Sequence, residues 1–246
     1  MPGHRTSHSD GVFTWLRDSF RHRGVAGSLR YYAREFGDLL RDLTPARRKS
    51  RYGDIDYDFE HSVDTTWATV SLRTRLREWL SGGQYQPSEP ARFVEILASL
   101  PVAVDGFTYI DLGSGKGRTL LMASSYPFRR IVGVELLDEL NSIAQHNVAR
   151  YRSGQQKCFN IKAHTGDARR FEFPPEPTVL YLFNPFPRHV WRDVLNNLRS
   201  SVLAAPRPVY VIYHNPVHDD ILAAQSWLHP LGRTHQFVIY QAVISG

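Results

Sequence analysis

The chain has 246 residues, of which 42% are hydrophobic and 12% aromatic, enough for one sizeable α/β domain with an appendage. No apolar run approaches the roughly 20 residues that a membrane-spanning helix needs, and the first residues lack the apolar core of a secretory signal. The single cysteine, Cys158, excludes internal disulfides and cysteine-based zinc sites, so we expect a protein of the reducing cytoplasm.

The positive charge lies at one end of the chain. Residues 1–51 carry 11 of the 30 Lys and Arg residues and 5 of the 24 Asp and Glu residues, whereas residues 52–246 carry 19 of each. The net charge of +6 therefore belongs to this leader. A basic segment can attract nucleic acid, an anionic membrane or an acidic partner, but we favour the plainer interpretation, in which the arginines keep a helical arm soluble.

Residues 1–84 are predicted to form a basic helical extension. Apolar residues recur at helical spacing over 12–23 and 29–43, and a further short helix is expected over 72–80. The apolar faces of these helices need a cover. We therefore expect the extension either to act as a lid on the rest of the chain or to form the contact of a homodimer.

Residues 52–64 are rich in acidic and aromatic side chains. Asp54, Asp56 and Asp58 alternate as in a calcium loop, but Thr65 stands where the EF-hand pattern requires its final Glu. We therefore reject a calcium site and predict no metal site in the chain. The functional interpretation of this segment is a lid that lines the substrate pocket.

A turn over 84–90 leads into a helix expected over 91–100, for which Ser88 is a suitable N-cap. A buried strand is then predicted over 107–112, followed by Gly113, Gly115 and Gly117 and a helix-forming stretch. Strand, glycine turn and helix form the geometry in which an open α/β sheet binds a ligand at the carboxyl ends of its strands.

Two common nucleotide motifs do not fit the glycine turn. The dinucleotide fingerprint G-x-G-x-x-G needs a small residue where the chain has Arg118. A phosphate loop ending at Gly115-Lys116 would need glycine in place of Ile110 and Ser or Thr in place of Gly117. The remaining pattern is D-L-G-x-G-x-G, with Asp111 at the end of the strand.

This pattern resembles motif I of the class I S-adenosylmethionine (SAM) methyltransferases, and the resemblance covers the chain from about Tyr85 to its end. It implies a Rossmann-like three-layer α/β sandwich with a mainly parallel sheet, a SAM-binding methyltransferase domain over 85–246, and SAM as the cofactor. Tyr85 resembles a tyrosine that closes over the methionine end of SAM in some lysine methyltransferases; packing on the sheet edge is the alternative. The turn residues that the resemblance assigns to SAM are Asp111, Gly113, Ser114, Gly115 and Gly117.

The next two strands also end on residues that the resemblance assigns to the cofactor. A strand over 130–135 ends at Glu135, 24 positions after Asp111, where the family has its ribose-binding carboxylate; Leu136 follows it. After a helix over 138–151 and a strand over 159–164 come Asp167 and Ala168, which match the adenine-binding position. A cap on the following turn is the alternative for Asp167.

The fourth strand, over 178–183, runs into Asn184-Pro185-Phe186-Pro187. This sequence resembles the N-P-P-[FY] motif of methyltransferases that act on amino groups, one proline short. The Asn184 oxygen and the following backbone carbonyl could accept two N–H hydrogens and aim the nitrogen lone pair at the methyl group. The alternative is a strand-ending turn. We predict Asn184, Pro185 and Phe186 as catalytic residues, with Asn184 also beside the cofactor.

A helix over 190–202 is followed by a fifth strand over 207–214, which ends at His214. With an ordinary pKa near ~6.5, this histidine could take a proton from the nucleophile, although a structural role is the alternative. Helix is expected over 217–228 and a last strand over 236–244. A sixth strand, needed for the usual antiparallel pair, is not evident.

The sequence therefore predicts a SAM-dependent methyltransferase that acts on a nitrogen of a protein side chain or a small-molecule amine. Methylation of oxygen or carbon in a small metabolite is one alternative. A SAM-binding regulatory or assembly protein without catalysis is another. We expect no nucleic-acid substrate, because residues 85–246 show no basic stripe and no known nucleic-acid module.

Overall fold

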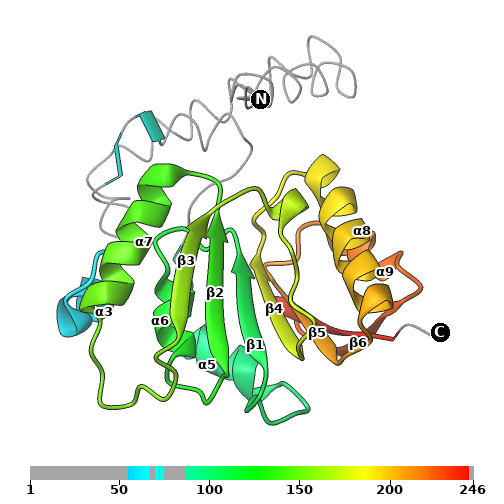
Figure 1. The fold of residues 1–246 in the computed structure, drawn as a ribbon, viewed down its shortest axis with the longest axis horizontal. Helices are drawn as coiled ribbons and strands as arrows, with labels where there is room; N and C mark the ends of the chain where they lie inside the picture. Colours follow the sequence, from blue (N-terminus) through cyan, green and yellow to red (C-terminus); the bar gives the residue numbers. More distant parts are fainter. Residues whose placement is uncertain (1–54, 67–69, 72, 75–86, 244–246) are drawn as a thin grey trace, which may run out of the picture.

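A computed structural model describes residues 55–66, 70–71, 73–74 and 87–243 of the chain (Figure 1). The helices expected over 12–23 and 29–43, most of the one expected over 72–80, and Tyr85 lie outside the described residues. The same holds for the proposed dimer contact of the extension. Across the described ranges, no helix combines the length and the apolar character that a membrane crossing requires.

The described chain is built on one seven-stranded sheet in the order β3-β2-β1-β4-β5-β7-β6. The first five strands are parallel, and β7 runs antiparallel to both β5 and β6. The strands are β1 (Thr108–Leu112), β2 (Arg130–Glu135), β3 (Ile161–Thr165), β4 (Thr178–Phe183), β5 (Val209–His214), β6 (Leu228–Arg233) and β7 (Phe237–Ala242). This confirms the predicted Rossmann-like fold, with β1 at the centre of the parallel part.

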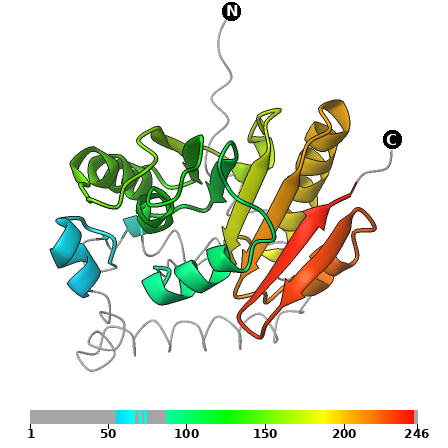
Figure 2. The same cartoon turned by 90° about the horizontal axis from the view of Figure 1, so that it is seen from below.

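Helices cover both faces of the sheet, which makes three layers (Figure 2). The helices are α3 (Ile55–His61), α5 (Pro90–Ala98), α6 (Arg118–Ala123), α7 (Asp138–Arg150), the 3-10 turn η2 (Ala168–Arg170), α8 (Arg188–Ala204) and α9 (Asp219–Ala223). Phe93 of α5 and Leu120 of α6 pack on one face, and Trp191 of α8 packs on the other. Because successive strand residues point to opposite faces, buried strands such as β1 supply both cores.

The prediction was wrong at the C-terminal end, where β6 completes an antiparallel pair with β7 and the helix expected over 217–228 shrinks to α9. β6 lies at the edge of the sheet, exposes all but its first residue, and contains Pro230 and Gly232 with a bulge between them. Proline is tolerated on an edge strand, where its missing N–H faces solvent. Without alternating apolar residues, such a strand leaves no periodic signal.

Ser88 does not cap α5, contrary to the prediction. The N-cap is Glu89, without a side-chain hydrogen bond, and Pro90 occupies the first turn. Ser88 lies one residue before the N-cap position, so its side chain does not cap the first turn. The Ser88 hydroxyl lies instead 3.0 Å from the Tyr181 hydroxyl of β4.

Candidate active site

The glycine turn between β1 and α6 has the backbone that its sequence requires. Gly113, Gly115 and Gly117 all have positive φ, at 89°, 53° and 82°, a region that other residues enter only with strain. The backbone N–H groups of Gly113 and Ser114 donate to the Val134 carbonyl, at 2.8 and 3.1 Å. These bonds fasten the turn to the end of β2.

The glycine turn lies directly against the N-P-F loop. A Cβ atom on Gly113 would stand 2.5 Å from Cβ of Pro185. The contact arises because β1 and β4 are neighbouring parallel strands, with Asp111 opposite Tyr181. Two motifs far apart in the sequence thus form one surface at the carboxyl edge of the sheet, and a side chain at position 113 would push them apart.

Gly133 in the middle of β2 is a site residue that the sequence analysis missed. A Cβ atom there would lie 2.6 Å from Cδ1 of Leu120 and 2.7 Å from Oγ of Ser114. The Ser114 hydroxyl is buried, with no hydrogen-bond partner within the described ranges. A glycine inside a strand often marks such a close approach, which was the available signal.

Two buried carboxyl groups flank the glycine turn. Asp111 is 2% exposed and accepts a hydrogen bond from the Thr119 hydroxyl. Glu135 is 8% exposed and accepts from the backbone N–H groups of Gly115 at 3.0 Å and Leu137 at 2.9 Å. No Lys or Arg of the described chain forms an ion pair with either carboxyl group.

The environment of these carboxyl groups disfavours their negative charges. Burial raises the pKa of Asp111 to about 7, against the hydrogen bond from Thr119 and together with the nearby charge of Glu135. Burial also raises the pKa of Glu135, although backbone hydrogen bonds oppose it. A cation bound here would relieve this cost, so the turn is suited to a positively charged ligand.

The end of β3 lies beside Glu135, because Glu135 pairs with Thr165. Asp167 caps η2 by accepting from the backbone N–H of Arg169 at 3.0 Å, and it forms an ion pair with that side chain. Partial burial opposes ionisation, but the hydrogen bonds from Arg169 outweigh it and lower the pKa of Asp167. The capping role is therefore present, and the predicted contacts of Asp167 and Ala168 with adenine stay a prediction. Leu136 is 54% exposed beside this edge.

Asn184 follows β4 in a left-handed conformation, with φ of 41°, which asparagine tolerates better than most residues. Its Oδ1 accepts a hydrogen bond from the Tyr213 hydroxyl at 3.1 Å, and that hydroxyl accepts from the backbone N–H of His218 at 3.0 Å. Phe186 packs edge-on against Trp191 of α8, 5.3 Å between ring centroids. The loop is thus anchored to β5 and α8, and Tyr213 is a further residue that the sequence analysis missed.

His214 lies at the end of β5, on the face of the sheet opposite to that of Tyr213. Its ring stacks on Phe183 at 4.0 Å with 14° between the planes, and its Nδ1 lies 2.7 Å from the Tyr181 hydroxyl. Burial, with a smaller contribution from Arg92, lowers the pKa of His214 to about 4. The imidazole is therefore neutral near pH 7.

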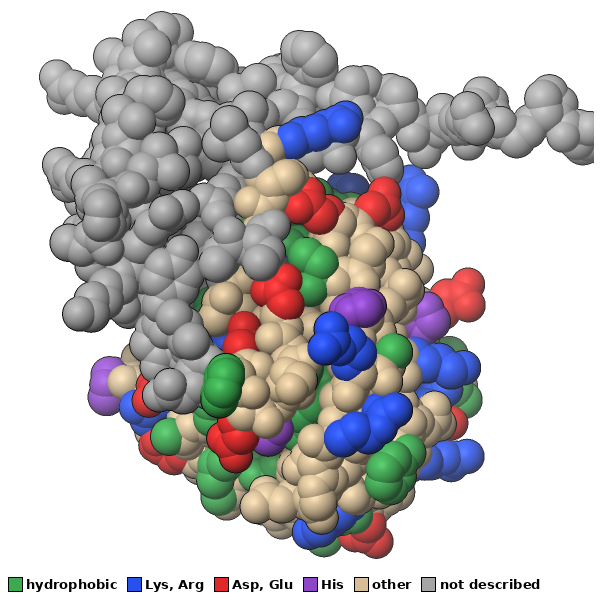
Figure 3. All heavy atoms as spheres, turned by 90° about the vertical axis from the view of Figure 1, so that its left-hand side faces the viewer, with side chains coloured by type: hydrophobic (Ala, Val, Ile, Leu, Met, Phe, Trp, Pro, Cys, Tyr) green, Lys and Arg blue, Asp and Glu red, His purple; other side chains and the backbone are tan. Residues whose placement is uncertain are grey.

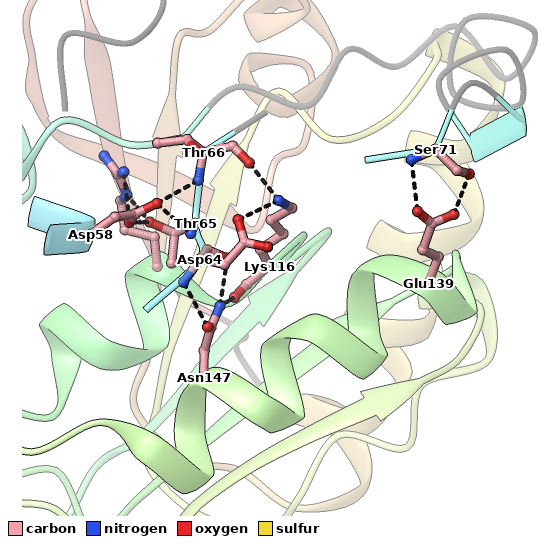
Figure 4. A network of polar contacts seen from close by, with 9 residues as sticks. Asp58, Asp64, Thr65, Thr66, Ser71, Lys116, Glu139 and Asn147 are labelled. Carbon is pink, nitrogen blue, oxygen red and sulfur yellow. Dashed lines mark hydrogen bonds and ion pairs between the residues drawn. The ribbon is translucent and has the colours of Figure 1, made fainter. Parts of the chain in front are cut away.

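Residues 55–66, with 70–71 and 73–74, form what we call the strap, which crosses α6 and α7 beside the glycine turn (Figure 4). Nζ of Lys116, a fully buried side chain, forms an ion pair with Asp64 at 2.8 Å. Nε of Arg118 donates to the Thr65 hydroxyl at 2.6 Å, and its NH2 group lies 3.4 Å from the Asp58 carboxylate. The charged groups of Lys116 and Arg118 thus both contact the strap.

The strap is also bonded to α7. The Asn147 amide accepts from the backbone N–H of Asp64 at 2.9 Å and donates to the carbonyls of Asp64 and Lys116, at 2.7 and 2.9 Å. Near the start of α7, Glu139 accepts from the N–H and hydroxyl of Ser71, at 2.8 and 2.6 Å (Figure 4). The sequence analysis placed none of these contacts, because they join residues far apart in the chain.

The acidic residues of the strap bind protein groups. Asp58 accepts from the backbone N–H groups of Thr65 at 2.7 Å and Thr66 at 2.9 Å. The side chains of Asp54 and Asp56 lie outside the described residues. Where side chains are described, no cluster of three or more His, Cys, Asp or Glu could hold a metal ion.

No family model and no curated protein matches this chain. Several solved structures resemble part of this chain at low sequence identity. A dimethyladenosine transferase from Plasmodium falciparum is 11% identical over 64% of this chain and 62% of that one, with a TM-score of 0.45. An RNA methyltransferase from Salinibacter ruber in complex with S-adenosyl-L-homocysteine is 20% identical over 63% and 92%, with a TM-score of 0.42.

A putative methyltransferase, yhhF, from Escherichia coli is 16% identical over 65% of this chain and 90% of that one, with a TM-score of 0.48. This chain spans less than two thirds of the length of the Plasmodium enzyme. The function of this chain is therefore inferred from the residues of its own site.

Proposed function

We propose that this chain is a SAM-dependent methyltransferase, with SAM at the carboxyl ends of β1, β2 and β3 and a nitrogen of a protein side chain or small amine as the methyl acceptor. The observation that carries the proposal is the pair of buried carboxyl groups, Asp111 and Glu135, beside a glycine turn. No cation from the described residues neutralises them, and SAM carries both a sulfonium and an ammonium charge. Its sulfonium would supply an electrophilic methyl group.

The residues around the turn fit such a cofactor. The turn would present backbone rather than large side chains to the ligand, because it is built from Gly113, Ser114, Gly115 and Gly117. Glu135 retains oxygen lone pairs for ribose hydroxyls. Leu136 exposes an apolar side chain on which an adenine ring could lie, with Asp167 and Ala168 at the next strand end. These assignments give the residues of the turn and of the strand ends the roles that the family resemblance of the sequence implies.

Asn184 is the residue that we assign to the acceptor. The contact between Gly113 and Pro185 brings its loop against the cofactor turn. The Oδ1 atom accepts one hydrogen bond from Tyr213 and keeps a second lone pair for an acceptor N–H. Methyl transfer needs the nitrogen lone pair in line with the methyl–sulfur bond that breaks. Holding the amine in one orientation is therefore the main contribution to catalysis that we assign to Asn184.

Replacing Asn184 by alanine should lower methyl transfer at least about 100-fold while leaving the affinity for SAM unchanged. Calorimetric titration with SAM and transfer of labelled methyl to a panel of peptides, amines and tRNA would measure the two effects. Asn215→Ala is the matched control, because Asn215 also precedes a proline at a strand end and has φ of 51°. An equal loss of binding and transfer in Asn184→Ala would argue against an orienting role.

The same measurements separate the alternatives. Tight SAM binding without product from any acceptor would favour a regulatory or assembly protein, and product on oxygen or carbon would exclude the nitrogen acceptor. On the face shown in Figure 3, Lys and Arg side chains lie mainly toward the centre and right, and many Asp and Glu side chains lie to their left. The tRNA in the panel tests the expectation that nucleic acid is not the acceptor.

SAM binding is expected to weaken as the pH falls below about 7, the raised pKa of Asp111. In the cofactor-free protein this carboxyl group is mostly protonated below that pH, and only its ionised form attracts a cation. The loss can reach about tenfold in affinity per pH unit, and the free energy of unfolding without SAM should fall over the same range as the pH rises. Titrations with Asp111→Asn should show no slope near neutrality; an unchanged slope would assign the effect to another group.

A further inference from the structure

A chain of hydrogen bonds leads from the start of α5 through β4 to the end of β5. The Ser88 hydroxyl lies 3.0 Å from the Tyr181 hydroxyl, which lies 2.7 Å from Nδ1 of His214. All three side chains are buried. The ring of His214 also stacks on Phe183, the residue directly before Asn184. The imidazole is therefore held in one plane at the edge of the sheet where the acceptor is proposed to bind.

The direction of these hydrogen bonds follows from the Ser88 end. Ser88 is 2% exposed, and Tyr181 is the acceptor within reach of its hydroxyl in the described part of the chain. If Ser88 donates to Tyr181, the phenol proton is left for Nδ1 of His214. The reverse direction would leave a buried serine proton without an acceptor, which costs about 1–3 kcal/mol.

A ring nitrogen that accepts a hydrogen bond carries no proton, so the neutral imidazole has its proton on Nε2. Nε2 is the ring nitrogen that meets no partner among the residues described. We propose that Ser88 and Tyr181 are positioning residues that hold His214 as the neutral Nε2–H tautomer, so that it offers the acceptor substrate a hydrogen-bond donor and not a base. The substrate would then carry an oxygen or nitrogen lone pair, such as a carbonyl or carboxylate, beside the methylated atom.

The statement about the substrate rests on the proposed function. The hydrogen bonds among Ser88, Tyr181 and His214 do not depend on that function. The surroundings support a neutral ring. Arg92 of α5 is the charged group that acts on His214, while Phe183 of β4 and Phe237 of β7 beside it do not titrate. Burial raises the pKa of Tyr181, so its hydroxyl stays protonated and remains a donor.

Nuclear magnetic resonance of the full chain with ring-¹⁵N histidine tests the proposal, with the His214 signals assigned by their loss in His214→Gln. The native protein should show the Nε2–H tautomer without titration between about pH 5.5 and pH 8. Tyr181→Phe removes the donor to Nδ1 and leaves the ring buried, so the ring should stay neutral but both of its tautomers should appear. A proton on Nδ1 in the native protein, or an unaltered ring in Tyr181→Phe, would overturn the proposal.

Tyr109→Phe is the matched control. Tyr109 is a buried tyrosine of β1 with its ring centroid 6.0 Å from that of Tyr181, and its hydroxyl has no hydrogen-bond partner among the described residues. Its loss should leave the His214 signals unchanged. Ser88→Ala keeps every ring in place and should also bring the second tautomer into view, because Tyr181 can then accept as well as donate.

A separate calorimetric titration with SAM distinguishes the two proposals. Native protein that shows the Nε2–H tautomer but does not bind SAM would contradict the proposed function and leave the role of Ser88 and Tyr181 intact. Native protein that binds SAM but carries the proton on Nδ1 would contradict the role of Ser88 and Tyr181 and leave the proposed function intact.

Discussion

Gly113→Ala is expected to abolish SAM binding and to lower the free energy of unfolding by about 2–5 kcal/mol. Two costs combine at this position. The backbone has φ of 89°, where a Cβ atom is strained, and the added atom would stand 2.5 Å from Cβ of Pro185. To make room, the glycine turn and the N-P-F loop must separate, and both proposed ligand sites lose their shape.

Gly106→Ala separates the two costs. Gly106 has nearly the same φ, 79°, but nothing lies within 4 Å of the position where its Cβ atom would be. It should lose only about 1–2 kcal/mol for the left-handed conformation and bind SAM normally. Urea denaturation and calorimetric titration measure both effects. If the two variants behaved alike, the contact with Pro185 would have no part in shaping the site.

Asp58→Ala is expected to lower the free energy of unfolding by about 3 kcal/mol or more. The variant removes an acidic partner of Arg118, a side chain that is only 2% exposed, and leaves the backbone N–H groups of Thr65 and Thr66 without their acceptor. The strap would then detach from α6, and the conformation of the adjacent glycine turn would be disturbed.

Asp220→Ala is the control for Asp58→Ala. Asp220 forms an ion pair with Arg188 in which both side chains are more than half exposed, so its loss should hardly change the urea midpoint. Equal midpoints for the two variants would mean that residues 55–66 add little to the folded domain. A drop confined to Asp58→Ala would instead support including the strap with the domain that we predicted to begin at residue 85.

The sequence by itself determined the parallel half of the sheet and the chemistry at its carboxyl edge. β1, β4 and β5 are short apolar runs with Gly, Asn or Pro at or near their ends, and β2 is a short apolar run that ends on Glu135. These signals are local. The glycine turn was predicted from a local signal as well, and its three glycines have the positive φ that glycine permits. The sequence alone therefore placed Asp111, Glu135, Asn184 and His214 at or next to the ends of strands.

Only the tertiary structure decided which of these residues meet and what holds them. The order of the strands brings Pro185 onto Gly113, and the alternation of side chains puts Tyr213 with Asn184 on one face and Tyr181 with His214 on the other. The edge strand β6 and the ion pair of Lys116 with Asp64 were likewise missed. The physical reason is that these contacts depend on burial and strand order, which join distant segments and leave no periodic trace in either one.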